Sequence, residues 1–261
     1  MGKNLIHVYS DVGTRDISLV HLLNALKTFT PKFQVKEING ASICSPGALH
    51  STALLCFGGG YDRGYLQSLG ESGCAVIREY IENGGKYLGL CAGAYFASDH
   101  CEFDKDGQLE VCGPRLIKLF EGDAVGSYRP GFKYNSEEGS WAISITCAVP
   151  SLKPKTMKTY LNGGCFFRTS KWTRSKALYC YEGTNDAAII ASRMGKGWGI
   201  LSGVHFEYDL NLLLSQSPTQ RTKEVVGQLQ ADEENRLQLF QTLVSALLTS
   251  DADYIDQLSS E

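Results

Sequence analysis

Three residue types that can build a nucleophilic triad stand at positions suited to catalysis. Cys91 lies in the stretch "YLGLCAGAYFAS", where an apolar run ends and a run of small residues begins. His205 and Glu207 follow a later apolar run, and residues two apart in an extended chain point to the same side. A thiol, an imidazole and a carboxylate in this relation can act as nucleophile, base and orienting acid. The pattern indicates thiol-based acyl transfer.

The surroundings of Cys91 indicate a sharp turn from a strand into a helix. Gly89-x-Cys91-x-Gly93 is the cysteine version of the G-x-S-x-G nucleophile elbow, in which small residues let helix and strand approach closely. Such a turn pushes the side chain out of the end of the sheet, and the helix N-terminus stabilises a thiolate and a developing oxyanion. The same pattern also suits a structural cysteine buried in an α/β turn.

The remaining histidines and one further thiol are weaker candidates. A structural or solvent-exposed role suits the histidines better than that of a base, because they fall in a strand, on a leucine-rich helix and in polar segments. Cys165 also has a glycine setting, but no His-x-Glu pair lies near it in the sequence. These less favoured residues are His7, His21, His50, His100 and Cys165.

Composition excludes several classes of function. The chain has 261 residues and a net charge of −3 without a basic block, so neither nucleic acid nor an anionic membrane is an expected partner. Nine cysteines at irregular spacing, with no C-x-x-C, argue against a zinc site or a disulfide framework. We expect no metal and no cofactor, and no P-loop supports ATP use. Without a signal peptide or an apolar run that could span a bilayer, the sequence predicts a cytoplasmic protein with reduced thiols.

The elements that must position these residues follow an α/β pattern. Strands alternate with amphipathic helices, which predicts a parallel sheet wrapped by helices. Ligands of such sheets bind at the carboxyl ends of the strands, where the glycines at 58–60 and Cys91 fall. The expected strands are Leu5 to Tyr9, Phe33 to Ile38, Ala53 to Phe57 and Lys86 to Leu90, with helices around 19–26 and 76–81.

The rest of the chain differs in character. Residues from about 101 to 176 are rich in Gly, Tyr and short strand-like runs, and we interpret them as a β-rich elaboration of the same domain. Strands at 187–191 and 199–201 should pair across the turn at 195–197. One closing helix is predicted within 221–248. We therefore divide the chain into an α/β domain at 1–220 and a C-terminal helix with a polar tail at 221–261, packed on that domain.

Four stretches of the sequence resemble those of a known family. "GGKYLGLCAGAYFAS", "GFKYNSEEGS", "YLNGGCFF" and "GKGWGILSGVHFE" occur in the order found in class I glutamine amidotransferase-like domains. They are most similar to the N-terminal domain of eukaryotic-type biotin protein ligases, and the resemblance spans most of Leu5 to Asp209. It implies a flavodoxin-like fold, a three-layer α/β structure with a parallel sheet.

The resemblance also implies roles for individual residues. Cys91, His205 and Glu207 would form the triad, although the family often has proline where this chain has Phe206. Backbone N–H groups of the glycine turn and of the residue after the nucleophile would form an oxyanion hole. Asn and Tyr residues of shared stretches would line the substrate pocket, and a turn-forming role suits the Asn residues equally well. The oxyanion-hole residues are Gly59, Gly60 and Ala92, and the pocket residues are Tyr134, Asn135 and Asn162.

These observations favour a cysteine-dependent amide hydrolase or amidotransferase that acts through a thioester. Glutamine or a similar small amide is the substrate that the resemblance implies, and a synthase or ligase chain is then expected as partner. The chain ends about 50 residues after the triad, so we expect no biotin ligation by this chain itself. Two alternatives remain open: a non-catalytic module that binds a small molecule or regulates a partner, and a peptidase-like hydrolase.

Overall fold

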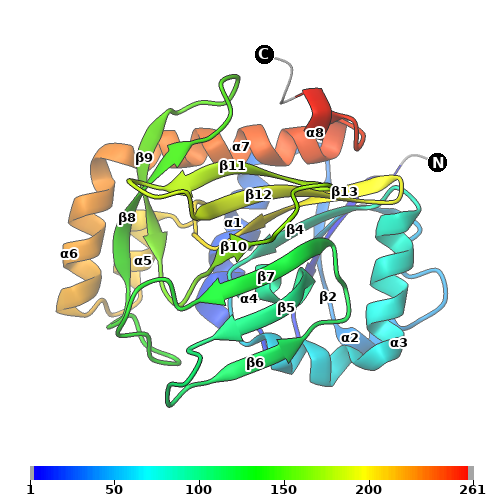
Figure 1. The fold of residues 1–261 in the computed structure, drawn as a ribbon, viewed down its shortest axis with the longest axis horizontal. Helices are drawn as coiled ribbons and strands as arrows, with labels where there is room; N and C mark the ends of the chain where they lie inside the picture. Colours follow the sequence, from blue (N-terminus) through cyan, green and yellow to red (C-terminus); the bar gives the residue numbers. More distant parts are fainter. Residues whose placement is uncertain (1–2, 258–261) are drawn as a thin grey trace.

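A computed structural model describes residues 3–257 and contains a helix-covered sheet with five parallel strands at its start (Figure 1). Their order is β2-β1-β3-β4-β13, the 2-1-3-4-5 order of flavodoxin-like folds. This confirms the predicted fold class. The strands are β1 (Leu5–Tyr9), β2 (Gln34–Ile38), β3 (Thr52–Phe57), β4 (Lys86–Leu90) and β13 (Gly197–Ser202).

Helices cover both faces of this sheet, which is why its central strands are almost continuously apolar. Helices α1 and α7 (Glu233–Thr249) pack on one face, where Leu22 and Leu26 meet Leu239 and Leu243 in one buried cluster. Helices α3 and α4 pack on the other face. The early helices are α1 (Asp16–Phe29), α2 (Gly40–Ile43), α3 (Asp62–Glu82, kinked at Gly70) and α4 (Ala92–Ala97).

The predicted β-rich segment extends the sheet. Beyond β13 the order continues β12-β10-β7-β5-β6, while β11, β8 and β9 branch from β12. From residue 98 to residue 209 the structure contains strands and loops but no helix. The predicted pair of strands across 195–197 is confirmed, since β12 and β13 are antiparallel neighbours. The added strands are β5 (Ser98–Phe103), β6 (Val111–Pro114), β7 (Phe120–Gly126), β8 (Trp141–Cys147), β9 (Thr156–Leu161), β10 (Phe166–Arg168), β11 (Ser175–Tyr181) and β12 (Ala187–Met194). His100, expected in a loop, lies in β5.

The C-terminal segment departs from the single predicted helix. Two helices, α6 and α7, are separated by a 3-10 turn at 230–232, because α6 packs beside the β8–β9 hairpin whereas α7 packs on the parallel sheet (Figure 1). Residues 258–261 of the predicted tail lie outside the described residues, and the division at residue 220 stays a prediction. The helices here are α5 (Leu210–Ser215), α6 (Gln220–Leu229), α7 (Glu233–Thr249) and α8 (Tyr254–Gln257).

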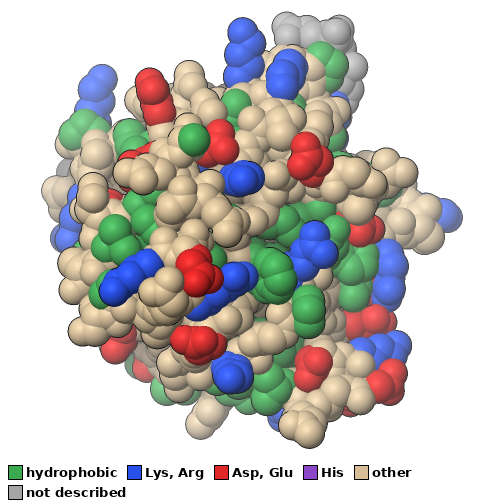
Figure 2. Space-filling model, turned by 90° about the vertical axis from the view of Figure 1, so that its left-hand side faces the viewer, with side chains coloured by type: hydrophobic (Ala, Val, Ile, Leu, Met, Phe, Trp, Pro, Cys, Tyr) green, Lys and Arg blue, Asp and Glu red, His purple; other side chains and the backbone are tan. Residues whose placement is uncertain are grey.

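The surface adds two observations. On the face that carries β8, β9 and α6, basic and acidic side chains are interspersed among apolar and polar ones (Figure 2). Within residues 3–257, no helix combines the length and apolar character needed to cross a membrane.

The turn between β4 and α4 has an unusual backbone conformation. Cys91 has φ 51° and ψ −106°, a conformation that a residue with a side chain rarely adopts. Close packing behind it leaves no room to relax: a Cβ on Gly93 would lie 2.2 Å from the carbonyl oxygen of Phe57. The small residues seen in the sequence are therefore required for α4 to approach β3.

We predict that Gly93→Ala destabilises the protein by about 1–3 kcal/mol, because the new methyl group overlaps a backbone atom that cannot move independently. Urea unfolding measures the effect. Gly227→Ala is the matched control, since a Cβ there meets no atom within 4 Å and Gly227 lies inside α6. The control should be neutral or stabilise by up to about 1 kcal/mol. Equal effects of the two changes would contradict the packing argument.

Candidate active site

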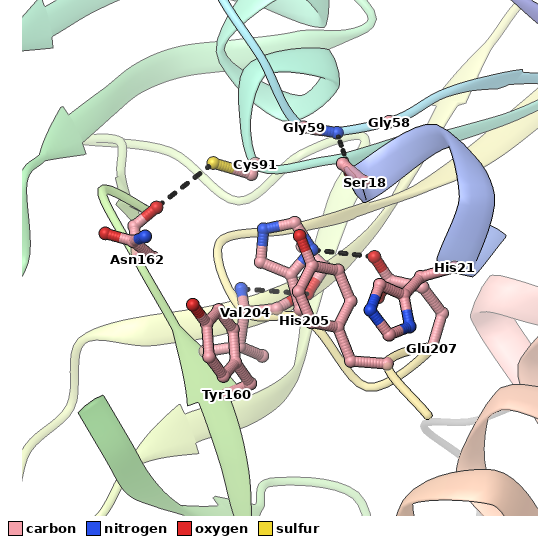
Figure 3. A network of polar contacts seen from close by, with 12 residues as sticks. Ser18, His21, Gly58, Gly59, Cys91, Tyr160, Asn162, Val204, His205 and Glu207 are labelled. Carbon is pink, nitrogen blue, oxygen red and sulfur yellow. Dashed lines mark hydrogen bonds and ion pairs between the residues drawn. The ribbon is translucent and has the colours of Figure 1, made fainter. Parts of the chain in front are cut away.

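Cys91 lies at the carboxyl end of β4, at the bottom of a cavity of about 180 Å³. Its N–H donates to the Ser202 carbonyl on β13 at 2.8 Å, which ties the turn to the neighbouring strand. Its side chain is 7% exposed, and Sγ lies 3.8 Å from the carbonyl oxygen of Asn162 (Figure 3). The thiol therefore faces the cavity from a fixed position rather than packing into the core.

His205 and Glu207 form a buried pair directly below the thiol (Figure 3). Nδ1 of His205 lies 2.6 Å from Oε1 of Glu207, and both side chains are almost completely buried. Burial alone would lower the pKa of His205, but the Glu207 charge, together with hydrogen bonds to Cys91 and Glu207, raises that pKa to about 10. The structure thus brings all three predicted triad residues together, with the imidazole between the thiol and the carboxylate.

The main chain of His205 is held by the β-rich elaboration. The His205 N–H donates to the Tyr160 carbonyl at 2.8 Å, and the Thr159 hydroxyl donates to the His205 carbonyl at 2.9 Å. Both partners lie on β9. The elaboration therefore does more than line the pocket, because it fixes the residue that faces the thiol.

The predicted oxyanion hole is placed at the cavity but changes in detail. The Gly59 N–H donates to the Ser18 hydroxyl at 2.7 Å, so this amide is engaged. The amides of Gly60 and Ala92 line the same cavity and have no hydrogen-bond acceptor within residues 3–257. Of the three predicted residues, Gly60 and Ala92 thus have free amides, and Gly59 lies against the ring of His205.

All three predicted pocket residues line the cavity. Asn162 contributes its carbonyl oxygen toward the thiol, and its side-chain amide donates to the Ser136 carbonyl at 2.9 Å. Asn135 has φ 55°, in the left-handed region that asparagine tolerates, so the turn-forming interpretation also fits. Tyr134 is 40% exposed at the mouth of the cavity.

The sequence analysis did not identify a carboxylate that contacts both the β-rich elaboration and the loop before α1. Glu137 accepts hydrogen bonds from the Tyr160 hydroxyl and from Nδ2 of Asn162, the latter at 3.2 Å. Arg15, from the loop before α1, pairs with its other oxygen at 2.5 Å. Glu137 lies within the shared stretch "GFKYNSEEGS", but its partners are too distant in sequence to have been identified there.

An aromatic stack behind the triad was also missed. His21 on α1 stacks on Tyr208 with ring centroids 4.1 Å apart, and Nδ1 accepts the Asp209 N–H at 3.0 Å. Burial, with a smaller contribution from the positive charge of His205, lowers the pKa of His21 to about 4. The ring is therefore neutral at neutral pH, which agrees with the structural role expected for His21.

Cys165 differs from Cys91 in how far its thiol is buried. Its side chain is fully buried, and burial raises the pKa of its thiol well above the usual range. Within residues 3–257, no group of three or more His, Cys, Asp or Glu side chains is arranged to bind a metal ion.

Comparison with known proteins identifies the family. The family model described as "Biotin-protein ligase, N terminal" matches residues 4–257. The chain belongs to the biotin–protein ligase N-terminal family. This confirms the resemblance seen in the sequence, since the match covers nearly the whole chain.

Two relatives and one solved structure are similar to this chain. A biotin–protein ligase of Schizosaccharomyces pombe is 34% identical over 207 residues, 77% of this chain and 33% of the ligase, so the chain spans about a third of that relative. A Chlamydia muridarum protein named only as uncharacterised is 32% identical over 265 residues, 98% of this chain and 99% of its own length. A Thermoplasma acidophilum protein provisionally named as part of a GMP synthase has a TM-score of 0.51 at 12% identity, covering 94% of this chain and 98% of its own. At that identity the likeness shows the fold alone.

The pKa of His205 predicts a pH-dependent stability. Because it is about 10 in the folded protein, above the 6.5 of an unperturbed histidine, protonation stabilises the fold. That stabilisation is complete below pH 6.5 and is lost as the pH rises through about 10. The difference in unfolding free energy between wild type and His205→Gln should therefore shrink steadily between about pH 6 and about pH 10 in urea titrations. A difference independent of pH would contradict a charged His205.

Proposed function

We propose that this protein is a cysteine-dependent enzyme that cleaves a small amide, either as a hydrolase or as an amidotransferase. The observation that carries the proposal is the strained Cys91 turn facing a buried His205–Glu207 pair across one cavity. Backbone strain of this kind, on the order of 1–3 kcal/mol, persists where the surrounding structure imposes it and clusters at active sites. Glutamine or a related amide is the default substrate by analogy with the amidotransferase fold.

The proposed reaction has two steps, formation of a thioester and its hydrolysis, and His205 transfers a proton in each. The Cys91 thiolate attacks the amide carbonyl, a C–S bond forms, and the oxyanion accepts the Gly60 and Ala92 N–H groups. Protonated His205 gives its proton to the nitrogen as the C–N bond breaks, which releases an amine or ammonia and leaves a thioester. Neutral His205 then takes a proton from water, which attacks the thioester and releases the carboxylic acid and the thiol. Glu207 holds the imidazole orientation and stabilises its charged form.

A second candidate function is a non-catalytic module that binds a small molecule and regulates a ligase. The family match favours it, because the fission yeast relative is a biotin–protein ligase about three times as long as the matching segment. In either case a synthase or ligase chain is the proposed partner. All nine cysteines are free thiols, which supports a reducing, cytoplasmic environment.

Alkylation by iodoacetamide separates a nucleophile from a structural cysteine. Cys44 and Cys112 are exposed, whereas Cys91 is buried, so accessibility alone predicts that Cys91 reacts more slowly than both. If His205 stabilises the thiolate, Cys91 should react at least about tenfold faster than both exposed thiols near pH 7. Peptide mapping by mass spectrometry measures the rates. Slower labelling of Cys91 than of Cys44 would remove the nucleophile assignment.

Variants of the buried pair separate the enzyme from the binding module. His205→Ala and Glu207→Gln should both reduce Cys91 alkylation near neutral pH, His205→Ala more severely, because each weakens the charge beside the thiol. On a cleaved substrate, Glu207→Gln should reduce turnover by about 10²–10⁴, as acid-to-amide changes do in related triads. The readout is the pH profile of alkylation in all three proteins. Three superimposable profiles would favour the binding module.

A further inference from the structure

Part of the cavity wall is aromatic. Tyr61 and Tyr134 make an edge-to-face contact at its mouth, with ring centroids 5.8 Å apart. Phe132 packs in the same way on Tyr134 at 5.0 Å and on Phe103 at 5.3 Å. Tyr95 continues the series on Phe103 at 5.8 Å. All five rings line the cavity that contains Cys91.

Two charged side chains of the cavity wall each hold one ion-pair partner. Arg15 pairs with Glu137, and the carboxylate of Asp62 accepts the Nε–H of Arg115 at 2.6 Å. Beyond these two and the triad histidine, the lining residues carry no Lys, Arg, Asp or Glu within the described part of the chain. Free glutamine would bring an ammonium and a carboxylate into this cavity, and each needs an opposite charge or several hydrogen bonds when water is excluded. Arg15 is paired through one Nη atom and Asp62 through Oδ2, so each keeps further polar atoms, and free glutamine remains the competing ligand for this cavity.

Asp62 provides one directional polar group on the aromatic side. It begins α3, and only its Oδ2 is taken by Arg115, whereas Oδ1 has no hydrogen-bond partner within residues 3–257. Arg115 is 3% exposed and also donates to the carbonyls of Gly113 and Pro114, so it holds Asp62 in place. Burial, with a smaller contribution from the nearby charge of Asp62, raises the pKa of Tyr134 to about 12. The carboxylate thus acts at the aromatic end of the cavity.

We propose that the amide substrate carries a flat apolar ring with an N–H or O–H donor, the ring packing on the aromatic wall and the donor bonding to Asp62. This inference rests on the proposed function and names its substrate class. The cavity is large enough for the ring itself, because an apolar cavity of about 150 Å³ accommodates benzene and this one measures about 180 Å³.

Four electrophiles test the proposal on the intact chain. They are chloroacetamide, N-benzyl-chloroacetamide, N-(4-hydroxybenzyl)-chloroacetamide and the chloroketone analogue of glutamine. In each case the Cys91 sulfur forms a C–S bond and chloride leaves, so no catalytic turnover is needed. Each rate is divided by that of the same reagent with glutathione. The normalised rate should rise at least about tenfold from chloroacetamide to the benzyl reagent, and further for the hydroxybenzyl reagent.

Variants of the cavity wall test which residues cause the preference for a ring-bearing reagent. Tyr134→Leu should reduce the benzyl-to-chloroacetamide ratio at least about fivefold. Trp172→Leu is the matched control, because Trp172 is a similarly exposed aromatic residue, 43% against 40%, outside this cavity. That control should leave the ratio unchanged. Asp62→Ala should remove the advantage of the hydroxyl group, and if the unpaired buried Arg115 prevents folding, the Tyr134→Leu ratio decides.

The outcomes separate this inference from the function on which it rests. If chloroacetamide labels Cys91 no faster than the exposed Cys44, the nucleophile is wrong and both proposals fail. If Cys91 is reactive but prefers the glutamine chloroketone or shows no ring preference, only the substrate class is overturned. An equal loss of ring preference in Tyr134→Leu and Trp172→Leu also overturns it, since the aromatic wall would then not be responsible.

Discussion

The backbone of Cys91 is the constraint on which the rest of the site depends. A residue with a side chain at φ 51° and ψ −106° is held there by its neighbours, on one side by the hydrogen bond to Ser202 and on the other by the close approach of Gly93 to Phe57. The turn aims the thiol into the cavity and places the first amide of α4 beside it. Both consequences follow from packing α4 tightly against the parallel sheet.

The second requirement is a buried pair of opposite charges. A buried imidazolium next to a buried carboxylate is stable only when the geometry is good, since desolvation of each ion is unfavourable. The 2.6 Å contact between His205 and Glu207 provides that geometry, and β9 fixes the main chain of His205. The β-rich elaboration therefore contributes to the reactivity of the site as well as to its walls.

The cavity is built from two parts of the fold, and each part supplies different chemical groups. The parallel sheet and its helices supply the Cys91 thiol, the His205 imidazole and the amides of Gly60 and Ala92, the groups that the proposed reaction uses. The elaboration supplies Phe103, Phe132 and Tyr134, and these rings give the cavity its apolar character. Membership of the biotin–protein ligase N-terminal family agrees with the fold, whereas the substrate of the proposed reaction depends on these local walls.

The sequence by itself determined the parallel strands, the elbow around Cys91 and the His205–Glu207 pair. These features have local signals: apolar runs of strand length, glycines two residues on either side of a cysteine, and a His-x-Glu spacing in an extended segment. Only the tertiary structure decided that Gly59 donates to Ser18, that Glu137 joins Arg15 to Tyr160, and that the expected closing helix divides into α6 and α7. The partners of those hydrogen bonds lie 41, 122 and 23 residues apart in the chain. No periodicity or short motif encodes such contacts, because they exist only once the sheet and its elaboration have brought distant segments together.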